Sequence, residues 1–182
     1  MNSRAKILLW SSNIWYLGEG MLGPLFAVFS QRVGGDVFQI ASAWSVYLFI
    51  RGLAQIITGR FSDGHGRKEI LSVVGFFLSA GATFCYLFVH SQTSLLLVQV
   101  LLGIGTAIAT PTWVSLYAQA EDRGSEGSEW GLMYGSIDMI VALALVIGGW
   151  IVSNYSFYAL FIVMGSIKTV AALIQTRILY KT

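Results

Sequence analysis

The sequence predicts an all-α membrane protein with six transmembrane helices. Only 11% of its 182 residues are charged, 55% are hydrophobic, and the mean hydropathy is +0.70. A soluble domain carries roughly a quarter charged residues, so this chain lacks the polar surface that water requires. Six apolar segments have about the 20 residues that a helix needs to cross the bilayer core. They are residues 7–29, 37–59, 70–89, 95–117, 130–152 and 157–179.

Each segment is expected to be a helix, because backbone polar groups in lipid must be satisfied internally and these runs are too long for barrel strands. The first segment follows Arg4 and Lys6, as a signal peptide would. It is too long, contains Glu19 and lacks a small-residue cleavage site, so we expect a retained span. Small residues in the third, fourth and fifth segments predict close helix packing within one bundle. They are Gly75, Ser79, Ala80 and Gly81, then Gly103, Gly105, Ala107 and Ala109, then Gly131, Gly135, Gly148 and Gly149.

The distribution of lysine and arginine predicts the orientation. If the N-terminus is cytoplasmic, eight of these residues fall on the cytoplasmic side and Arg32 alone falls on the other. Positive charge is enriched in cytoplasmic loops, so both termini are expected in the cytoplasm of a multi-pass plasma-membrane protein. The eight are Arg4, Lys6, Arg60, Arg67, Lys68, Arg123, Arg177 and Lys181.

Several function classes are disfavoured by the composition. The net charge of +2 gives no nucleic-acid footprint. Cys85 is the single cysteine, and the two histidines belong to different loops, so we expect no disulfide, metal or cofactor. The sequence has no HExxH motif, no Ser/His/Asp set at one depth and no phosphate-binding loop, which argues against an enzyme.

The turn between the second and third predicted helices reads Gly-Arg-Phe-Ser-Asp-Gly-His-Gly-Arg-Lys over residues 59–68. An ordinary cytoplasmic turn accounts for its basic residues but not for its Gly-Asp-Gly-Arg spacing. Gly64 and Gly66 are expected to permit positive φ and a tight reversal. This stretch resembles the loop signature of the major facilitator superfamily, G-x-x-x-D-(R/K)-x-G-R-(R/K)-(R/K). Gly59, Asp63, Gly66, Arg67 and Lys68 match it, whereas Gly64 and Glu69 replace basic residues.

The resemblance implies a secondary active transporter whose six-helix half contains two inverted three-helix repeats. It also implies a cytoplasmic gate. Asp63 would contact the start of the fifth helix of the other half, and Arg67 would pair with the acids after the fourth helix, Glu121 and Asp122. A fourth-helix arginine linked to proton coupling is replaced by Gln99, and a fifth-helix Gly-Pro pair is replaced by Ala144-Leu145. A drug–proton antiporter is therefore disfavoured.

Family members usually have twelve helices, whereas this chain stops three residues after its sixth predicted helix. We expect a half-transporter that pairs with a second copy of itself and moves a small solute. Two alternatives stay open at this point. The chain is a fragment of a longer transporter, or it is a six-helix membrane protein with another role.

Four charged residues lie inside the predicted spans: Glu19, Arg51, Asp138 and Lys168. Each is expected to need a partner, because a charge at membrane depth costs roughly 2.5–3.5 kcal/mol. Their depths suggest the pairs Arg51–Asp138 and Glu19–Lys168. The family arrangement implies that Arg51 meets Asp138 of a second copy, and a pair within one chain is the alternative.

In the family, the first and fourth helices line the solute cavity. The candidates here are Asn13, Tyr16 and Glu19 on the first helix and Thr106, Thr110 and Trp113 on the fourth. This mixture of polar and aromatic groups suits a small amphipathic or cationic solute. The alternative interpretation is structural. Threonine commonly bonds its own helix, and tryptophan and tyrosine form interfacial belts, for which Trp10, Trp15, Tyr117 and Trp130 are candidates.

Overall fold

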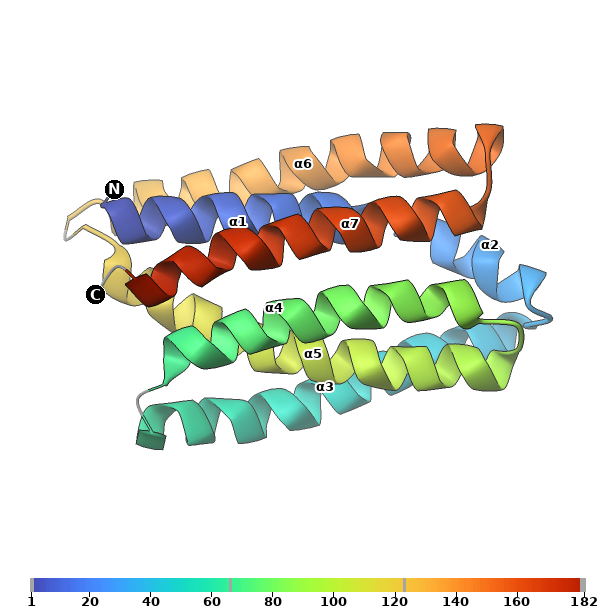
Figure 1. The fold of residues 1–182 in the computed structure, drawn as a ribbon, viewed down its shortest axis with the longest axis horizontal. Coiled ribbons are helices and arrows are strands. Elements are labelled where there is room, and N and C mark those ends of the chain that lie inside the picture. The colour runs from blue at the N-terminus through green and yellow to red at the C-terminus, as the bar shows by residue number, and fades with distance from the viewer. Residues whose placement is uncertain (1, 66, 123, 181–182) are drawn as a thin grey trace.

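The computed structural model describes residues 2–65, 67–122 and 124–180. Its long helices lie side by side in an elongated bundle with both termini at one end (Figure 1). The regular structure in these residues is entirely helical, which confirms the all-α prediction. The α-helices are α1 Ser3–Gly20, α2 Leu25–Arg32, α3 Val37–His65, α4 Lys68–Phe84, α5 Gln92–Ala120, α6 Glu126–Asn154 and α7 Phe157–Gln175, and the 3-10 segments are η1 Cys85–Phe88 and η2 Thr176–Tyr180.

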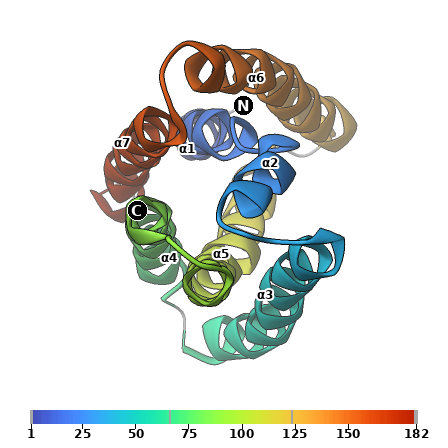
Figure 2. The same ribbon diagram turned by 90° about the vertical axis from the view of Figure 1, so that its right-hand side faces the viewer.

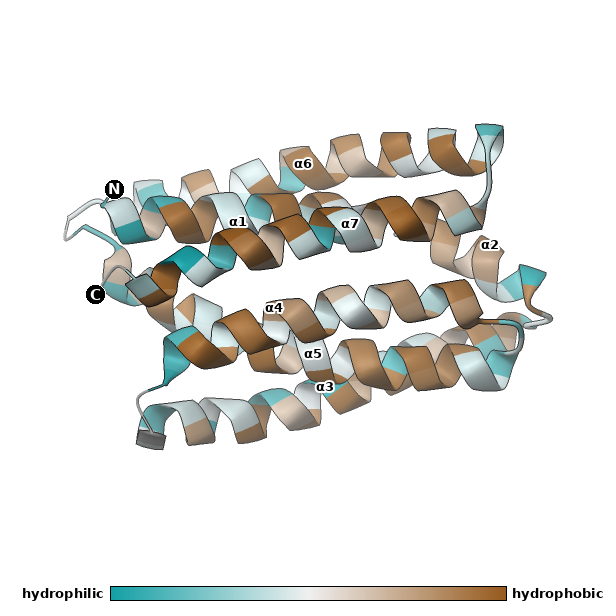
Figure 3. Cartoon of the chain, in the orientation of Figure 1, coloured by the Kyte–Doolittle hydropathy of each residue, from teal (hydrophilic) through white to brown (hydrophobic). Residues whose placement is uncertain are grey.

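Five helical segments are long and apolar enough to cross a membrane. They cover residues 37–64, 68–88, 92–120, 126–154 and 157–180, and they correspond to the second through sixth predicted spans. Apolar residues cover most of the length of the helices, and hydrophilic residues gather at their ends (Figure 3). This distribution fits helices whose middle sections lie in hydrocarbon and whose ends lie in the headgroup region.

The first predicted span, residues 7–29, is divided between α1 and α2. Gly23 has a positive φ of 20°, and Pro24 is the N-cap of α2. Proline lacks the N–H that an uninterrupted helix would use, so the chain turns here. Neither piece is among the five segments that are long and apolar enough to cross. The sixth crossing therefore stays a prediction.

Side-chain caps fix where several helices begin. Asn2 Oδ1 accepts the Ala5 N–H at 2.9 Å at the start of α1, and Ser156 Oγ accepts the Ala159 N–H at 3.2 Å at the start of α7. Ser91 forms a reciprocal capping box with Ser94 at the start of α5. Each cap satisfies backbone donors that the first turn of a helix leaves free.

The helices do not all pack equally. α5 packs against α3 and α4, α1 packs against α6 and α7, and α4 packs against α7. The helices α3 and α6 lie at opposite edges of the bundle, with the other long helices between them (Figures 1 and 2). Packing therefore encloses α1, α4, α5 and α7 more fully than α3 and α6.

Close helix crossings depend on glycine, as the small-residue pattern predicts for some positions. A Cβ added at Gly75 on α4 would collide with the backbone of Ala109 on α5, and one at Gly105 would approach the Ser79 backbone nitrogen to 2.7 Å. On α6 the prediction is confirmed at Gly148, where a Cβ would collide with the Met21 carbonyl oxygen, but it is wrong at the other three predicted glycines. In the described residues, a Cβ at Gly131, or at its equivalents Gly135 and Gly149, would meet nothing within 4 Å, and the same holds for Gly81 on α4.

Candidate functional site

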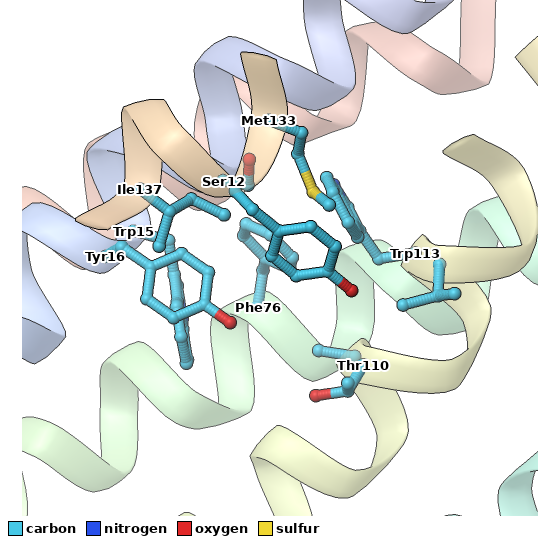
Figure 4. Close-up of a pocket in the computed structure, with 11 residues that line it drawn as sticks. Ser12, Trp15, Tyr16, Phe76, Thr110, Trp113, Met133 and Ile137 are labelled. Carbon is cyan, nitrogen blue, oxygen red and sulfur yellow. The ribbon is translucent and has the colours of Figure 1, made fainter. Parts of the chain in front are cut away.

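A pocket of about 140 Å³ lies among α1, α4, α5 and α6 (Figure 4). Three of its residues recur at helical spacing on one face of α1, and two on α6 are four residues apart, so each helix presents one face to the pocket. The walls are Ser12, Trp15 and Tyr16 from α1, Phe76 from α4, Ala109, Thr110, Trp113 and Val114 from α5, and Met133, Tyr134 and Ile137 from α6.

The inner wall of the pocket is held in place by packing and hydrogen bonds. Trp113 is buried, its Nε1 donates to the Leu8 carbonyl at 3.2 Å, and its ring stacks on Tyr117 at 5.3 Å between centroids. Trp15 is also buried and meets Tyr16 edge to face at 4.9 Å. These contacts fix the orientations of both indole rings, so the pocket has a preformed aromatic wall.

The outer side of the pocket is open. Tyr134 is 59% exposed and Val114 is 39% exposed, although both line it. Thr110 directs its hydroxyl hydrogen to its own helix, because Oγ1 donates to the Thr106 carbonyl at 2.8 Å. Among the described residues that line the pocket there is no charged side chain. The pocket thus presents aromatic faces and a few hydroxyl groups, which suit a molecule with a large apolar or aromatic part.

The structure brings together only some of the predicted solute-facing residues. Tyr16, Thr110 and Trp113 line the pocket, whereas Asn13, Glu19 and Thr106 do not. Asn13 is buried against α6, where its Oδ1 accepts from Ser136 Oγ at 3.1 Å. Thr106 is buried, and its Oγ1 has no hydrogen-bond partner in the described part of the chain. The solute-facing role of Asn13, Glu19 and Thr106 therefore stays a prediction, and it would need a larger cavity than this pocket.

Sequence reasoning missed most of the aromatic wall. It treated Trp15 and Tyr117 as possible belt residues, but both are buried, with 7% and 0% exposure. The belt interpretation is wrong for these two and fits Trp10, which is 62% exposed. The four-residue spacing between Met133 and Ile137 was the signal on α6. It was overlooked because other apolar residues nearby, among them Leu132, Met139 and Ile140, obscure this spacing.

Glu19 and Lys168 form an ion pair across α1 and α7. Lys168 Nζ lies 2.6 Å from Glu19 Oε2 and 4.9 Å from the centroid of the Trp15 ring. The lysine is fully buried, and Gly18 makes room for its stem, since a Cβ there would lie 2.8 Å from Lys168 Cγ. This is the pairing that the depth of the two residues predicts.

Arg51 and Asp138, the other predicted pair, lie apart. Arg51 is half-buried on α3, and its Nε has no hydrogen-bond partner among the described residues. Its guanidinium carbon lies 5.9 Å from the Tyr47 ring centroid. Asp138 is exposed on α6, at the other edge of the bundle (Figure 2). Between the two there is no ion pair in the part of the chain that the structure describes.

The predicted gate lies at the end of the bundle that holds both termini. Asp63 pairs with Lys68 at 2.9 Å, and Lys68 Nζ also donates to Ser115 Oγ on α5 at 2.8 Å. Gly59 accepts from Ser62 Oγ within α3, at 2.9 Å. Gly66 lies outside the described residues. Lys68 therefore joins the start of α4 to α3 through Asp63 and to α5 through Ser115.

Two details of the gate differ from expectation. Gly64 does not reverse the chain, because α3 continues to His65 and Gly64 has no positive φ. Glu121 accepts from Trp130 Nε1 at 2.6 Å, whereas Arg67 is exposed at the N-cap of α4 and no ion pair joins these two described residues. Asp122 is exposed in the loop before α6.

Comparisons with known proteins agree with the resemblance of the loop. The sequence profile described as Major Facilitator Superfamily matches residues 8–181. An uncharacterised MFS-type transporter of Methanocaldococcus jannaschii is 28% identical over 159 residues, which cover 87% of this chain and 41% of that protein. Multidrug resistance protein MdtL of Klebsiella pneumoniae strain 342 is 27% identical over 180 residues, which cover 99% of this chain and 44% of that protein. The chain thus spans less than half the length of these relatives.

Proposed function

This chain belongs to the major facilitator superfamily, and we propose that it forms one six-helix half of a transporter that moves a small solute by alternating access. The family and the matched relatives support membrane transport rather than catalysis. The observation that carries the proposal is the pocket, which is walled by buried aromatic rings and open at Tyr134 and Val114. A site shared between two halves would be open toward the second half, as this pocket is.

We propose six spans in the plasma membrane, with α1 and α2 together forming the first. The packing supports two inverted three-helix repeats, because α1 contacts the two helices that follow α5, and α5 contacts α3 and α4, which follow α1 and α2. Both termini are proposed to be cytoplasmic. The starts of α1 and α4 and the ends of α3 and α7 lie at one end, which therefore gathers most of the basic residues (Figure 1).

The proposed second half is another copy of this chain, packed against α3 and α6. Gly131, Gly135 and Asp138 share one face of α6 by helical spacing, and a Cβ added at either glycine would meet nothing within 4 Å among the described residues. Small residues let helix backbones approach closely in lipid. A two-fold axis would place Arg51 of each copy beside Asp138 of the other, so the contact would form twice.

Charge reversal tests this assembly. Arg51→Asp and Asp138→Arg are made singly in a Cys85→Ser background. Each variant also carries Gly52→Cys and Gly135→Cys, so that two copies can crosslink through these positions. We expect neither variant to crosslink alone in lipid and the coexpressed pair to recover crosslinking. Recovery only when both changes are in one chain would assign the pair to a single subunit. A strictly monomeric wild-type chain would overturn the pairing of two copies.

The proposed solute is small and amphipathic, with an aromatic or apolar body that packs against the rings of the pocket. Two matched relatives carry the name multidrug resistance protein, which fits compounds of this class. Gln99 and Ala144-Leu145 replace family residues that are linked to proton coupling, so their presence leaves the class of solute open. An aromatic wall also accepts a cation, because the ring face attracts positive charge.

Tyr134→Ala tests the pocket, with tetraphenylphosphonium as the probe. Tyr158→Ala on α7 is the matched control, because the two tyrosines are 59% and 60% exposed but only Tyr134 lines the pocket. We expect Tyr134→Ala to weaken binding by about three- to tenfold, since an aromatic contact contributes roughly 0.5–1.5 kcal/mol. Equal binding by both variants would remove the pocket from the proposal.

The gate is proposed to close the cytoplasmic side when the two halves come together there. Asp63 keeps three quarters of its side chain exposed while it pairs with Lys68. That exposure leaves it accessible to the start of α6 in the second half, where the helix dipole favours a carboxylate. Asp63→Asn is expected to slow transport without weakening tetraphenylphosphonium binding. A loss of binding instead would indicate that Asp63 supports the fold of the unit.

A further inference from the structure

A second hollow lies on the outside of the bundle, between α1 and the segment formed by α7 and η2. It is a groove of about 340 Å³ and shares no lining residue with the aromatic pocket. Its position on two neighbouring helices and its distance in sequence from the gate set it apart from the sites described above. Its lining comprises Ser3, Lys6, Ile7, Trp10, Ile14, Ile174 and Arg177.

The groove has an apolar floor that runs along the helices. Ile7, Trp10 and Ile14 recur at positions i, i+3 and i+7 on one face of α1, and Ile174 faces them from α7. Ile14 lies about 12 Å deeper along the helix axis than Lys6, at 1.5 Å per residue. Trp10 is 62% exposed, so its ring stands at the surface where tryptophan anchors a helix in the headgroup region.

The basic residues lie at one end of this floor. Lys6 and Arg177 are both exposed, and in the described part of the chain neither forms an ion pair with a carboxylate. Two other cations at this end are neutralised, because Arg4 pairs with Glu69 at 2.7 Å and Lys68 pairs with Asp63. The groove therefore combines uncompensated positive charge at its mouth with hydrocarbon contact below it.

We propose that this groove is a binding site for one anionic phospholipid. The phosphate lies between Lys6 and Arg177, and an acyl chain follows Ile7, Trp10 and Ile14 toward the middle of the bilayer. The proposed orientation places the groove in the cytoplasmic leaflet, where anionic lipids are enriched. The proposed assembly uses α3 and α6, which contribute no residue to the groove, so a bound lipid and a second copy do not compete.

Lipid retention on the full chain tests the site. The protein is released from bilayers of phosphatidylcholine and phosphatidylglycerol with identical acyl chains, and bound lipid is counted by native mass spectrometry. We expect wild type to retain one phosphatidylglycerol in preference to phosphatidylcholine. Lys6→Gln and Arg177→Gln should each weaken this preference by roughly fivefold, the effect of one basic residue near an anionic lipid surface.

Arg60→Gln is the matched control, because Arg60 is an exposed cation near the end of α3 and does not line the groove. It should leave the preference unchanged. An equal effect of Arg60→Gln, or equal retention of the two lipids by wild type, would overturn the proposal. Excess glycerol 3-phosphate should fail to displace the lipid, and its success would show that the groove binds a soluble phosphate instead. Retention is measured without transport, so its failure leaves the proposed transport function standing.

Discussion

The chain treats its two sets of charged residues at membrane depth in opposite ways. Glu19 and Lys168 meet inside the bundle at 2.6 Å, whereas Arg51 and Asp138 lie on helices at opposite edges. An unpaired charge in lipid is costly, so the second arrangement is stable only with lipid headgroups, water or another protein beside it. Among the described residues, the charges on α1 and α7 thus satisfy each other within the chain, whereas those on α3 and α6 do not meet.

The helices that carry these charges also differ in how much of each helix is buried. Half of the most apolar window of α4 and 44% of that of α7 are buried, against 11% for α3 and 22% for α6. Hydropathy does not explain the difference, since α6 has a mean value of 2.1 and α7 has 2.0. α6 and α7 thus look alike in hydropathy and differ in burial, whereas the open helix α3 is also less hydrophobic, with a mean value of 1.4.

The largest effect is expected from breaking the closed pair. Glu19→Gln leaves the fully buried Lys168 ammonium without its carboxylate, and an uncompensated buried charge typically costs about 3–5 kcal/mol. We therefore expect a large loss of folded protein in thermal unfolding followed by size-exclusion chromatography. The double variant Glu19→Gln with Lys168→Met should recover most of the loss. A double variant as unstable as Glu19→Gln would mean that Glu19 has a separate structural role.

Glycine substitutions compare the two sides through packing. Gly75→Ala places a Cβ against the Ala109 backbone, and overpacking typically costs about 1–3 kcal/mol. Gly135→Ala fills open space on α6 and should be neutral or stabilising by up to about 1 kcal/mol, because alanine favours helix. Both are measured as free energies of unfolding of the monomer in detergent. Equal losses would show that the Gly135 face of α6 is also packed within its own chain.

Sequence reasoning reached the helices and one of the charge pairs because these follow from local rules. Hydropathy located the second through sixth spans, and depth along a helix identified Glu19 and Lys168 as partners. It could not show that Gly23 and Pro24 divide the first span, since both are tolerated in membrane helices. The split depends on a backbone conformation that the composition of the segment does not determine.

The aromatic pocket and the gate were harder to predict because they depend on how helices rotate about their axes. Trp10 and Trp15 lie five residues apart on α1, yet Trp15 is buried beside the pocket and Trp10 is exposed. Only the packing of α1 against its neighbours separates them. Glu121 bonds Trp130 for a similar reason, because the loop between α5 and α6 sets its direction.

A smaller effect is expected from a polar relay on the packed side. Ser11 Oγ donates to Gln175 Oε1 at 2.6 Å, and Gln175 Nε2 donates to Ser72 Oγ at 2.9 Å, so the amide joins α1, α7 and α4. Gln175→Leu should cost about 1 kcal/mol, since hydrogen bonds between membrane helices contribute roughly 0.6 kcal/mol each. Gln55→Leu on α3 is the control and should change the free energy of unfolding less. A neutral Gln175→Leu would assign the stability of this junction to apolar packing.

The smallest effect on the monomer is expected from Asp138→Asn, the same carboxyl-to-amide change as Glu19→Gln. Asp138 is exposed and has no ion pair with Arg51 in the described residues, so its monomer stability in detergent should change by less than about 0.5 kcal/mol. In lipid, where we propose that two copies meet, the same variant should reduce crosslinking between copies. If Asp138→Asn destabilises the dilute monomer as strongly as Glu19→Gln does, both carboxylates act within one chain. The contrast between a closed and an open side of the unit would then fail.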